Sequence, residues 1–166
     1  MSPAAVATKK IRKFRLHARP SAVLRNLKVL LDNPQETPEL SNDIEAEAKA
    51  AQAFLDPAAL YTTVVRGSAP GELDPFWEPA AGDPAPVALT LFAATIGAGL
   101  ETELAGALSR GETFRGRVLT ALGEELADQA AAFIERLVGE EAQSDACELL
   151  SRRLCTEDPP PLAVLT

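Results

Sequence analysis

Histidine, cysteine and aromatic residues are all scarce in this chain of 166 residues. The single histidine, His17, excludes a His-rich metal site and leaves any histidine-based catalytic triad dependent on that one residue. The two cysteines, Cys147 and Cys155, are too few for a disulfide framework, and a zinc site would need further ligands. Aromatic residues make up 5% of the chain, so the core must be mainly aliphatic. These shortages predict no metal site.

Long apolar runs are absent as well. The longest ones, such as 87–100, are too short and too rich in small residues to span a bilayer. The N-terminal residues do not show the charged segment followed by an apolar one that directs export. We therefore expect a soluble, cytoplasmic protein that has no membrane partner.

Acidic residues are missing from one part of the chain. Residues 1–30 carry eight basic side chains, whereas all 24 acidic residues follow in the remainder, and the whole chain has a net charge of −8. A basic segment on an acidic body is typical of proteins that bind nucleic acid or an anionic partner. It can also serve to neutralise the acidic body of its own domain. A nucleic-acid partner is the less expected, because Phe14 is the only aromatic residue among these charges.

Hydrophobic periodicity predicts an α+β fold, in which several helices pack on a small, mostly antiparallel sheet. We expect one domain over 9–155, between a disordered leader at 1–8 and a proline-rich tail at 156–166. The predicted strands are 10–18, 60–65 and 87–96. The predicted helices are 20–31, 41–55, 100–110, 112–138 and 141–154.

Two of the predicted strands have distinct patterns. The first alternates, so that Phe14, Leu16 and Ala18 fall on one face, which is typical of a half-buried strand. The strand over 87–96 is continuously apolar, and such a run predicts a central strand buried on both faces.

Other local expectations concern helix ends, glycines and one aromatic pair. Ser41 or Asn42 can cap the second helix.

Gly116 and Gly123 weaken the long helix by about 1 kcal/mol each, and their expected benefit is the close approach of another backbone. The long loop over 66–86 contains Phe76-Trp77, which either contacts a partner or, as we favour, packs back to pin the loop.

Nucleotide and hydrolase motifs do not fit the sequence. Gly97-Ala98-Gly99 follows a strand and precedes a helix, but the third glycine of a dinucleotide fingerprint would fall at Thr102. The chain has no Walker lysine, no GxSxG serine and no HExxH pair. The residues alone therefore predict no catalytic group.

A resemblance to a known family begins at the strand over 87–96. Three motifs follow in the order that the family has them: the turn Thr95-Ile96-Gly97, the step from Gly111 to Gly116, and the series Leu119, Ala121 and Gly123. A long alanine-rich helix completes the pattern. Upstream, the basic strand, the VLRNL segment and Asp56-Pro57 before Leu60-Tyr61 also match in order. Over roughly 9–153 the chain resembles the activation domain of cobalamin-dependent methionine synthase.

This resemblance implies a role in reactivation. Such a domain docks over the corrinoid and presents S-adenosylmethionine while an electron donor reduces cob(II)alamin, so that the cobalt can be methylated again. The expected partners are a corrinoid protein or homocysteine methyltransferase, and possible further partners include the electron donor. The task is positioning with little acid or base chemistry, so the resemblance leaves open whether the chain is itself an enzyme. The alternative is a non-catalytic interaction module that keeps the fold without binding S-adenosylmethionine.

The resemblance also indicates candidate binding residues. Arg152 and Arg153 stand where the family has its ligand arginine, but Leu-Cys-Thr follows here in place of Pro-Gly-Tyr. A guanidinium there could pair with the ligand's carboxylate. Thr95, Gly97 and Gly99 form a turn of small residues that a large planar ring could approach. The competing interpretation is that the glycines serve only a positive φ, and both interpretations expect Gly99→Ala to fold normally if Gly99 has a negative φ.

Overall fold

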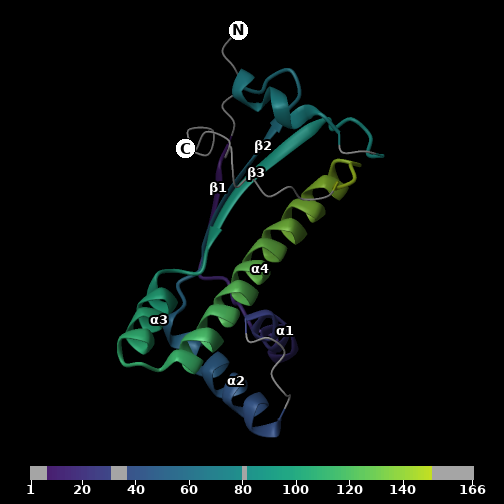
Figure 1. Cartoon of the computed structure of the whole chain (residues 1–166). Coiled ribbons are helices and arrows are strands. Elements are labelled where there is room, and N and C mark those ends of the chain that lie inside the picture. The colour runs from purple at the N-terminus through teal and green to yellow at the C-terminus, as the bar shows by residue number, and fades with distance from the viewer. Residues whose placement is uncertain (1–6, 31–36, 80–81, 151–166) are drawn as a thin grey trace. The chain divides into compact units, whose positions relative to one another are not determined.

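The computed structural model describes residues 7–30, 37–79 and 82–150. They form a small α+β fold with a three-stranded antiparallel sheet and several helices, which confirms the predicted fold class. In chain order the elements, labelled in Figure 1 apart from the 3₁₀ helices η1 and η2, are β1 (Lys9–Arg12), α1 (Pro20–Leu30), α2 (Pro38–Ala51), η1 (Gln52–Phe54), β2 (Ala58–Val65), η2 (Gly71–Trp77), β3 (Ala88–Thr95), α3 (Gly99–Ser109) and α4 (Thr113–Ser144). Within these residues, no helix is both long and apolar enough to cross a membrane.

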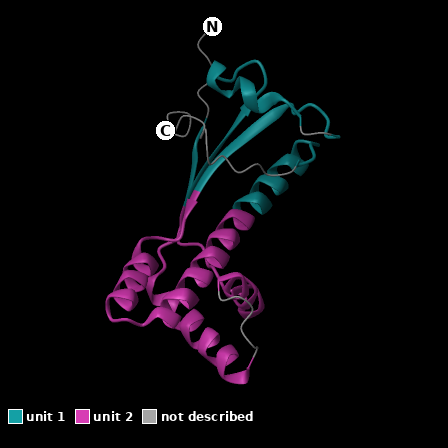
Figure 2. Cartoon of the chain, viewed as in Figure 1, with its two compact units in different colours: residues 1–11, 59–93, 134–166 teal, residues 12–58, 94–133 magenta. Residues whose placement is uncertain are grey.

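The chain divides into two compact units, which Figure 2 colours separately. Unit 1 comprises residues 1–11, 59–93 and 134–166, and it holds most of the sheet together with η2. Unit 2 comprises residues 12–58 and 94–133, and it holds α1, α2, η1, α3 and the first part of α4. Most of the predicted leader, at 1–6, and the whole predicted tail at 156–166 lie outside the described residues.

The sheet has the order β1-β2-β3, so β2 is the central strand and β3 lies at an edge (Figure 1). The prediction that 87–96 is a strand is confirmed over Ala88–Thr95, but its expected burial on both faces is wrong. Its first five side chains are half-buried and its last three are exposed. Leu89 and Leu91 pack against the cluster of Val64, Leu73 and Trp77. An apolar run alone could not tell a central strand from an edge strand.

The predicted strand over 10–18 is wrong beyond Arg12. Lys13 has a φ of 59°, which turns the chain out of the sheet, and its N–H donates to the carbonyl of Pro57 at 2.9 Å. The alternation still has a meaning, because Leu16 is buried and Phe14 and Ala18 pack against the helical core of unit 2. The alternation therefore correctly indicated which side chains face a core, but that core is built of helices and the segment beyond Arg12 is not a strand.

The helices agree with the prediction except at some of their ends. The N-terminus of α2 is at Pro38, three residues before the predicted cap, because the hydroxyl of Thr37 accepts the N–H of Leu40 at 3.2 Å. At its C-terminus α4 continues to Ser144, so residues 141–144 are helical, but as part of α4. The prediction of a separate helix over 141–154 is wrong, because 145–150 are not helical, and 151–154 lie outside the described residues. The chain leaves α4 at Ala146, whose φ is 57°, and Cys147 N–H donates back to the carbonyl of Ala142 at 2.8 Å.

The aromatic pair in the 66–86 loop packs back, as favoured above. Trp77 is 6% exposed and belongs to the cluster with Val64 and Leu73, and Phe76 packs against the same cluster. The guanidinium of Arg66 lies over the Trp77 ring, 5.9 Å from its centroid. The alternative, an exposed aromatic pair that contacts a partner protein, is wrong.

The core of unit 2 forms where α1, α2 and α3 pack against the first part of α4. Its buried side chains are almost all aliphatic, as the composition predicts. Gly116 and Gly123 of α4 face leucine side chains of α3, because a Cβ on Gly116 would lie 2.7 Å from Leu108 and one on Gly123 would lie 3.4 Å from Leu100. The expected approach of another backbone is therefore wrong, and these two glycines make room for side chains.

Candidate functional site

The turn between β3 and α3 brings together three of the predicted site residues, Thr95, Gly97 and Gly99. Gly97 has a φ of 88°, and its N–H donates to the Thr95 hydroxyl at 3.0 Å. The carbonyl of Ile96 accepts the N–H of Asp56 at 3.0 Å, so the turn is hydrogen-bonded to the segment that follows η1. Arg152 and Arg153, the other predicted site residues, lie outside the described residues.

Both glycines of this turn pack against the chain's own backbone. A Cβ on Gly97 would lie 3.0 Å from the Asp56 nitrogen, and one on Gly99 would lie 2.2 Å from the Phe54 carbonyl oxygen. The expectation that Gly99→Ala folds normally is therefore wrong, because backbone occupies the space that the methyl group needs. On the side where a Cβ would point, the space beside both glycines is therefore filled by the protein itself. A positive φ accounts for Gly97, whereas Gly99 is required for close packing.

The same segment after η1 also lines an open hollow of about 290 Å³. This volume is just below the roughly 300–1,000 Å³ typical of small-molecule sites. One part of the lining is the chain just after β1 and the other is the chain around η1: Lys13, Phe14, Arg15, Leu16, Gln52, Leu55, Asp56 and Pro57. The hydrogen bond from Lys13 N–H to the Pro57 carbonyl joins the two parts.

The hollow has an apolar floor and a cationic rim. Leu16 and Pro57 are buried, and Leu55 is half-buried. The side chains of Lys13 and Arg15 are exposed, and within the described residues neither makes a hydrogen bond or an ion pair. The only acidic residue of the lining is Asp56, whose carboxylate is also unpaired within this part of the chain.

None of the residues that the sequence singled out as binding candidates lines this hollow. The signal that could have found it was the basic segment in residues 1–30, together with Asp56-Pro57 at the end of a helix. Both features are visible in the sequence, but the contact between Lys13 and Pro57 joins residues more than forty positions apart, and no local pattern predicts such a contact.

Arg19, in the same basic segment, is paired. Arg19 Nε donates to Glu125 at 2.8 Å, and Gln129 donates to the same carboxylate at 2.9 Å. The side chain of Glu125 is 1% exposed. Burial raises the pKa of Glu125, but the hydrogen bonds from Arg19 and Gln129 outweigh burial and hold this pKa below its ordinary value. Arg19 is thereby fixed to α4.

Lys9, at the start of the segment, is paired as well. Its ammonium lies 2.6 Å from Glu141, which also accepts the hydroxyl of Tyr61 at 2.6 Å. These two hydrogen bonds, first that of Lys9 and then that of Tyr61, lower the pKa of Glu141. The Tyr61 side chain is buried, and burial and the bond to Glu141 raise its pKa.

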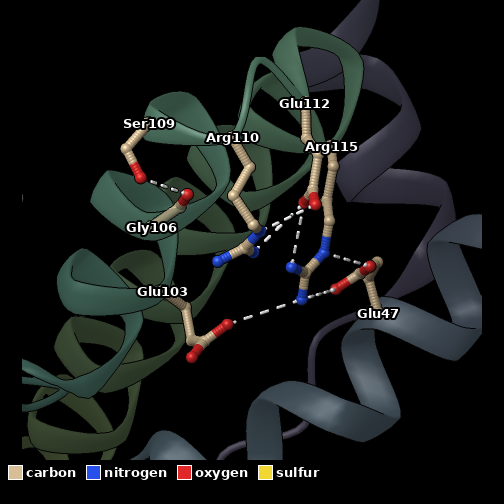
Figure 3. Close-up of polar contacts among 7 residues, drawn as sticks. All are labelled: Glu47, Glu103, Gly106, Ser109, Arg110, Glu112 and Arg115. Carbon is tan, nitrogen blue, oxygen red and sulfur yellow. Dashed lines mark hydrogen bonds and ion pairs between the residues drawn. The ribbon is translucent and has the colours of Figure 1, made fainter.

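A second group of charges ties three helices of unit 2 together (Figure 3). Arg115 on α4 lies 2.7 Å from Glu47 on α2, 3.3 Å from Glu112 and 3.6 Å from Glu103 on α3. The hydrogen bonds to Glu47 and then to Glu112 raise the pKa of Arg115. Arg110 also pairs with Glu112, at 2.8 Å. Each charge in this group has a partner, so the group holds helices together and has no free cation for a ligand.

The predicted contacts for S-adenosylmethionine are described only in part, because Arg152 and Arg153 lie outside the described residues. At Gly97 and Gly99, backbone atoms of Phe54 and Asp56 occupy the space that a side chain would take. The cations of the hollow, Lys13 and Arg15, would repel the sulfonium of this ligand and attract its carboxylate. Within the described residues, no group of three or more histidine, cysteine, aspartate or glutamate side chains could hold a metal ion.

Comparison with known proteins adds no family. No protein-family model matches the chain, and no curated protein matches it. The resemblance to the activation domain of methionine synthase therefore stands on the order and spacing of its motifs alone.

Proposed function

We propose that this chain is a binding module without catalytic chemistry of its own, and that it docks onto a corrinoid-dependent methyltransferase through the surface around the hollow. The observation that carries the docking function is the pair of unpartnered cations, Lys13 and Arg15, above an apolar floor. Apolar contacts supply binding energy there, and the cations select an anionic partner.

The corrinoid partner is inferred from the resemblance. Elements occur in the order that the motifs imply: β3 ends in the turn at Ile96 and Gly97, α3 follows, and Gly111, with a φ of 76°, connects α3 to α4. A module of this kind contributes by positioning, since it holds the partner in one arrangement and needs no acid or base. The cytoplasmic location and the electron donor predicted from the sequence belong to this proposal as well.

The proposal assigns docking and no methyl transfer to this chain, because the unpaired cations of the hollow, Lys13 and Arg15, suit an anionic partner surface. When bound to the assembly, that cofactor would supply the methyl group. The contribution of Lys13, Arg15 and the residues beneath them is to bind the partner's surface and to exclude water from the apolar part of the contact.

Isothermal titration calorimetry of the full chain with a purified, cobalamin-carrying methionine synthase tests the proposal. We expect a complex with a Kd below about 100 μM, or roughly 5.5 kcal/mol of binding free energy. S-adenosylmethionine titrated into the chain alone should give no binding tighter than about 1 mM, or roughly 4 kcal/mol. Absence of a complex would contradict the corrinoid partner, and tight binding of S-adenosylmethionine would contradict the restriction to docking.

A second candidate is an interaction module whose partner carries no corrinoid. The hollow favours this candidate as much as the first, because nothing in its lining requires a corrinoid. The same titration with the cobalamin-free methyltransferase separates the two. Binding that needs cobalamin supports the first candidate, and equal binding to both forms shows that the corrinoid itself is not recognised.

A further inference from the structure

The basic segment in residues 1–30 is divided into paired and unpaired cations. Lys9 and Arg19 form ion pairs with Glu141 and Glu125. Between them, four cations have no partner in the described part of the chain: Lys10, Arg12, Lys13 and Arg15. Of these four, only Lys13 and Arg15 line the hollow, so they are the unpaired cations that a ligand in the hollow would meet.

The side of the hollow that carries these cations is held in place at two points. Lys13 N–H is bonded to the Pro57 carbonyl at 2.9 Å, and Lys13 has a left-handed φ of 59°. Six residues later, Arg19 is bonded to the buried carboxylate of Glu125. The intervening backbone therefore needs little further ordering on binding, and a preorganised site loses less entropy when a ligand binds.

The lining carries two cations, Lys13 and Arg15, against one carboxylate, that of Asp56, and so favours an anionic ligand. Beneath the cations lie Leu16 and Pro57, which are buried, and Leu55, which is half-buried. A ligand that uses both parts must combine negative charge with an aliphatic side chain. The volume of about 290 Å³ admits a few side chains and no large cofactor.

Nucleic acid fits this lining poorly. Single strands bind through basic grooves whose aromatic side chains stack on the bases. Phe14 is the only aromatic residue of the lining, and its ring already stacks on Phe133, with centroids 4.4 Å apart and an angle of 3° between the planes. One face of the ring is thus occupied within the protein.

We propose that the hollow binds an acidic segment of a partner protein, in which glutamate or aspartate side chains pair with Lys13 and Arg15 and an aliphatic side chain packs on Leu16, Leu55 and Pro57. This inference deepens the proposed docking function by naming the chemistry of the partner's contact. It does not depend on whether that partner carries a corrinoid.

Fluorescence anisotropy with a fluorescein-labelled decapeptide of glutamates and two central leucines tests this assignment on the full chain. The reference peptides replace the glutamates by lysines or the leucines by alanines, and a thymidine oligonucleotide of equal length serves as the nucleic-acid probe. We expect the acidic peptide to bind at least tenfold more tightly than any of these three. The affinity should fall as salt concentration rises, because the cations on the rim are exposed.

Two double variants with the same net charge locate the site. Lys13→Glu with Arg15→Glu should weaken the acidic peptide at least tenfold. Lys10→Glu with Arg25→Glu exchanges two other exposed cations that do not line the hollow, and it should change the affinity by no more than about threefold. Thermal unfolding of both variants, and of Lys13→Gln with Arg15→Gln, shows whether the fold is retained.

Two results would overturn the assignment, and a third would separate it from the proposed corrinoid partner. Equal losses in the two double variants would mean that general electrostatic attraction binds the peptide. Tighter binding of the oligonucleotide would make the segment a nucleic-acid surface. Binding of the acidic peptide together with no complex with the methyltransferase would leave this inference intact and refute the corrinoid partner, so the two failures are distinguishable.

Discussion

The turn over 95–99 and the hollow beside it contact the same stretch of chain around Asp56, but they differ in what fills them. At the turn, the spaces beside Gly97 and Gly99 are occupied by the backbone of Phe54 and Asp56. At the hollow, Lys13, Arg15 and the Asp56 carboxylate meet no partner within the described residues. The sequence had placed the binding function at the turn, where the structure shows internal packing.

Small residues and unpaired charges therefore give different information about function. A glycine in a strand-to-helix turn can serve a ligand or a close backbone contact, and only the position of the neighbouring chain decides between them. An exposed, unpaired cation contributes little to stability, so its substitution should leave the fold intact. We therefore expect substitutions at the turn to affect folding and substitutions at the hollow to affect binding.

The largest expected effect is that of Gly99→Ala. Its new methyl group would meet the Phe54 carbonyl oxygen at 2.2 Å, and since backbone cannot rotate away, we expect a loss of about 3 kcal/mol in the free energy of unfolding. The control is Gly106→Ala in the same helix, where the Cβ meets only the flexible end of Arg110 at 3.2 Å. That control should be neutral or more stable, by up to about 1 kcal/mol. Urea denaturation measures both, and a Gly99→Ala variant as stable as the parent would contradict the packing of the turn.

Gly97→Ala should be less harmful. The residue must keep a φ of 88°, and its Cβ would lie 3.0 Å from the Asp56 nitrogen, so a small shift has to relieve the contact. We expect a loss of about 1–2 kcal/mol, by the same denaturation experiment. A loss larger than that of Gly99→Ala would reverse the order that the geometry predicts.

Arg19→Gln should produce a pH-dependent loss of stability. With Arg19 present, the pKa of Glu125 in the folded protein is below its ordinary value of 4.5, so the pair stabilises the fold above pH 4.5 and loses this effect as the pH falls below it. The difference in Tm between the parent and the variant should therefore be larger at pH 7 than at about pH 3.5. Arg25→Gln, at another exposed cation of the basic segment, should show little difference at either pH. Equal differences at both pH values would mean that Arg19 does not act through the charge of Glu125.

The smallest expected effect on folding is that of Lys13→Gln with Arg15→Gln. Neither side chain has a partner to lose among the described residues, so Tm and the urea midpoint should equal those of the parent. A clear loss of stability would show that these cations serve the fold, and the contrast between turn and hollow would then disappear.

Local patterns predicted most of the elements. The 3.6-residue periodicity gave α1, α3 and most of α4, and the apolar run gave β3. The end predicted for the long helix at residue 138 is wrong, because α4, with 32 residues, continues through Gly139 to Ser144, and the chain leaves it where Ala146 adopts a left-handed conformation. One glycine weakens a helix by about 1 kcal/mol, which tertiary packing can offset.

Contacts between distant segments could not be predicted in the same way. The central place of β2, the exit of the chain at Lys13 and the hollow between residues 13–16 and 52–57 all depend on which segments meet. The packing of Gly99 on Phe54 is of the same kind, since the glycine alone indicates a special conformation and does not name its neighbour. Local sequence patterns therefore pointed to the turn, whereas the hollow is apparent only when the distant segments 13–16 and 52–57 are seen together.

The most direct test of the central claim is a titration of the ¹⁵N-labelled chain with the acidic peptide, followed by the amide shifts in ¹H–¹⁵N spectra. The account predicts that the largest changes fall on Lys13, Arg15 and Gln52, and that these changes disappear in Lys13→Glu with Arg15→Glu. Changes centred on Thr95–Gly99, or spread evenly over the exposed cations of residues 1–30, would contradict it.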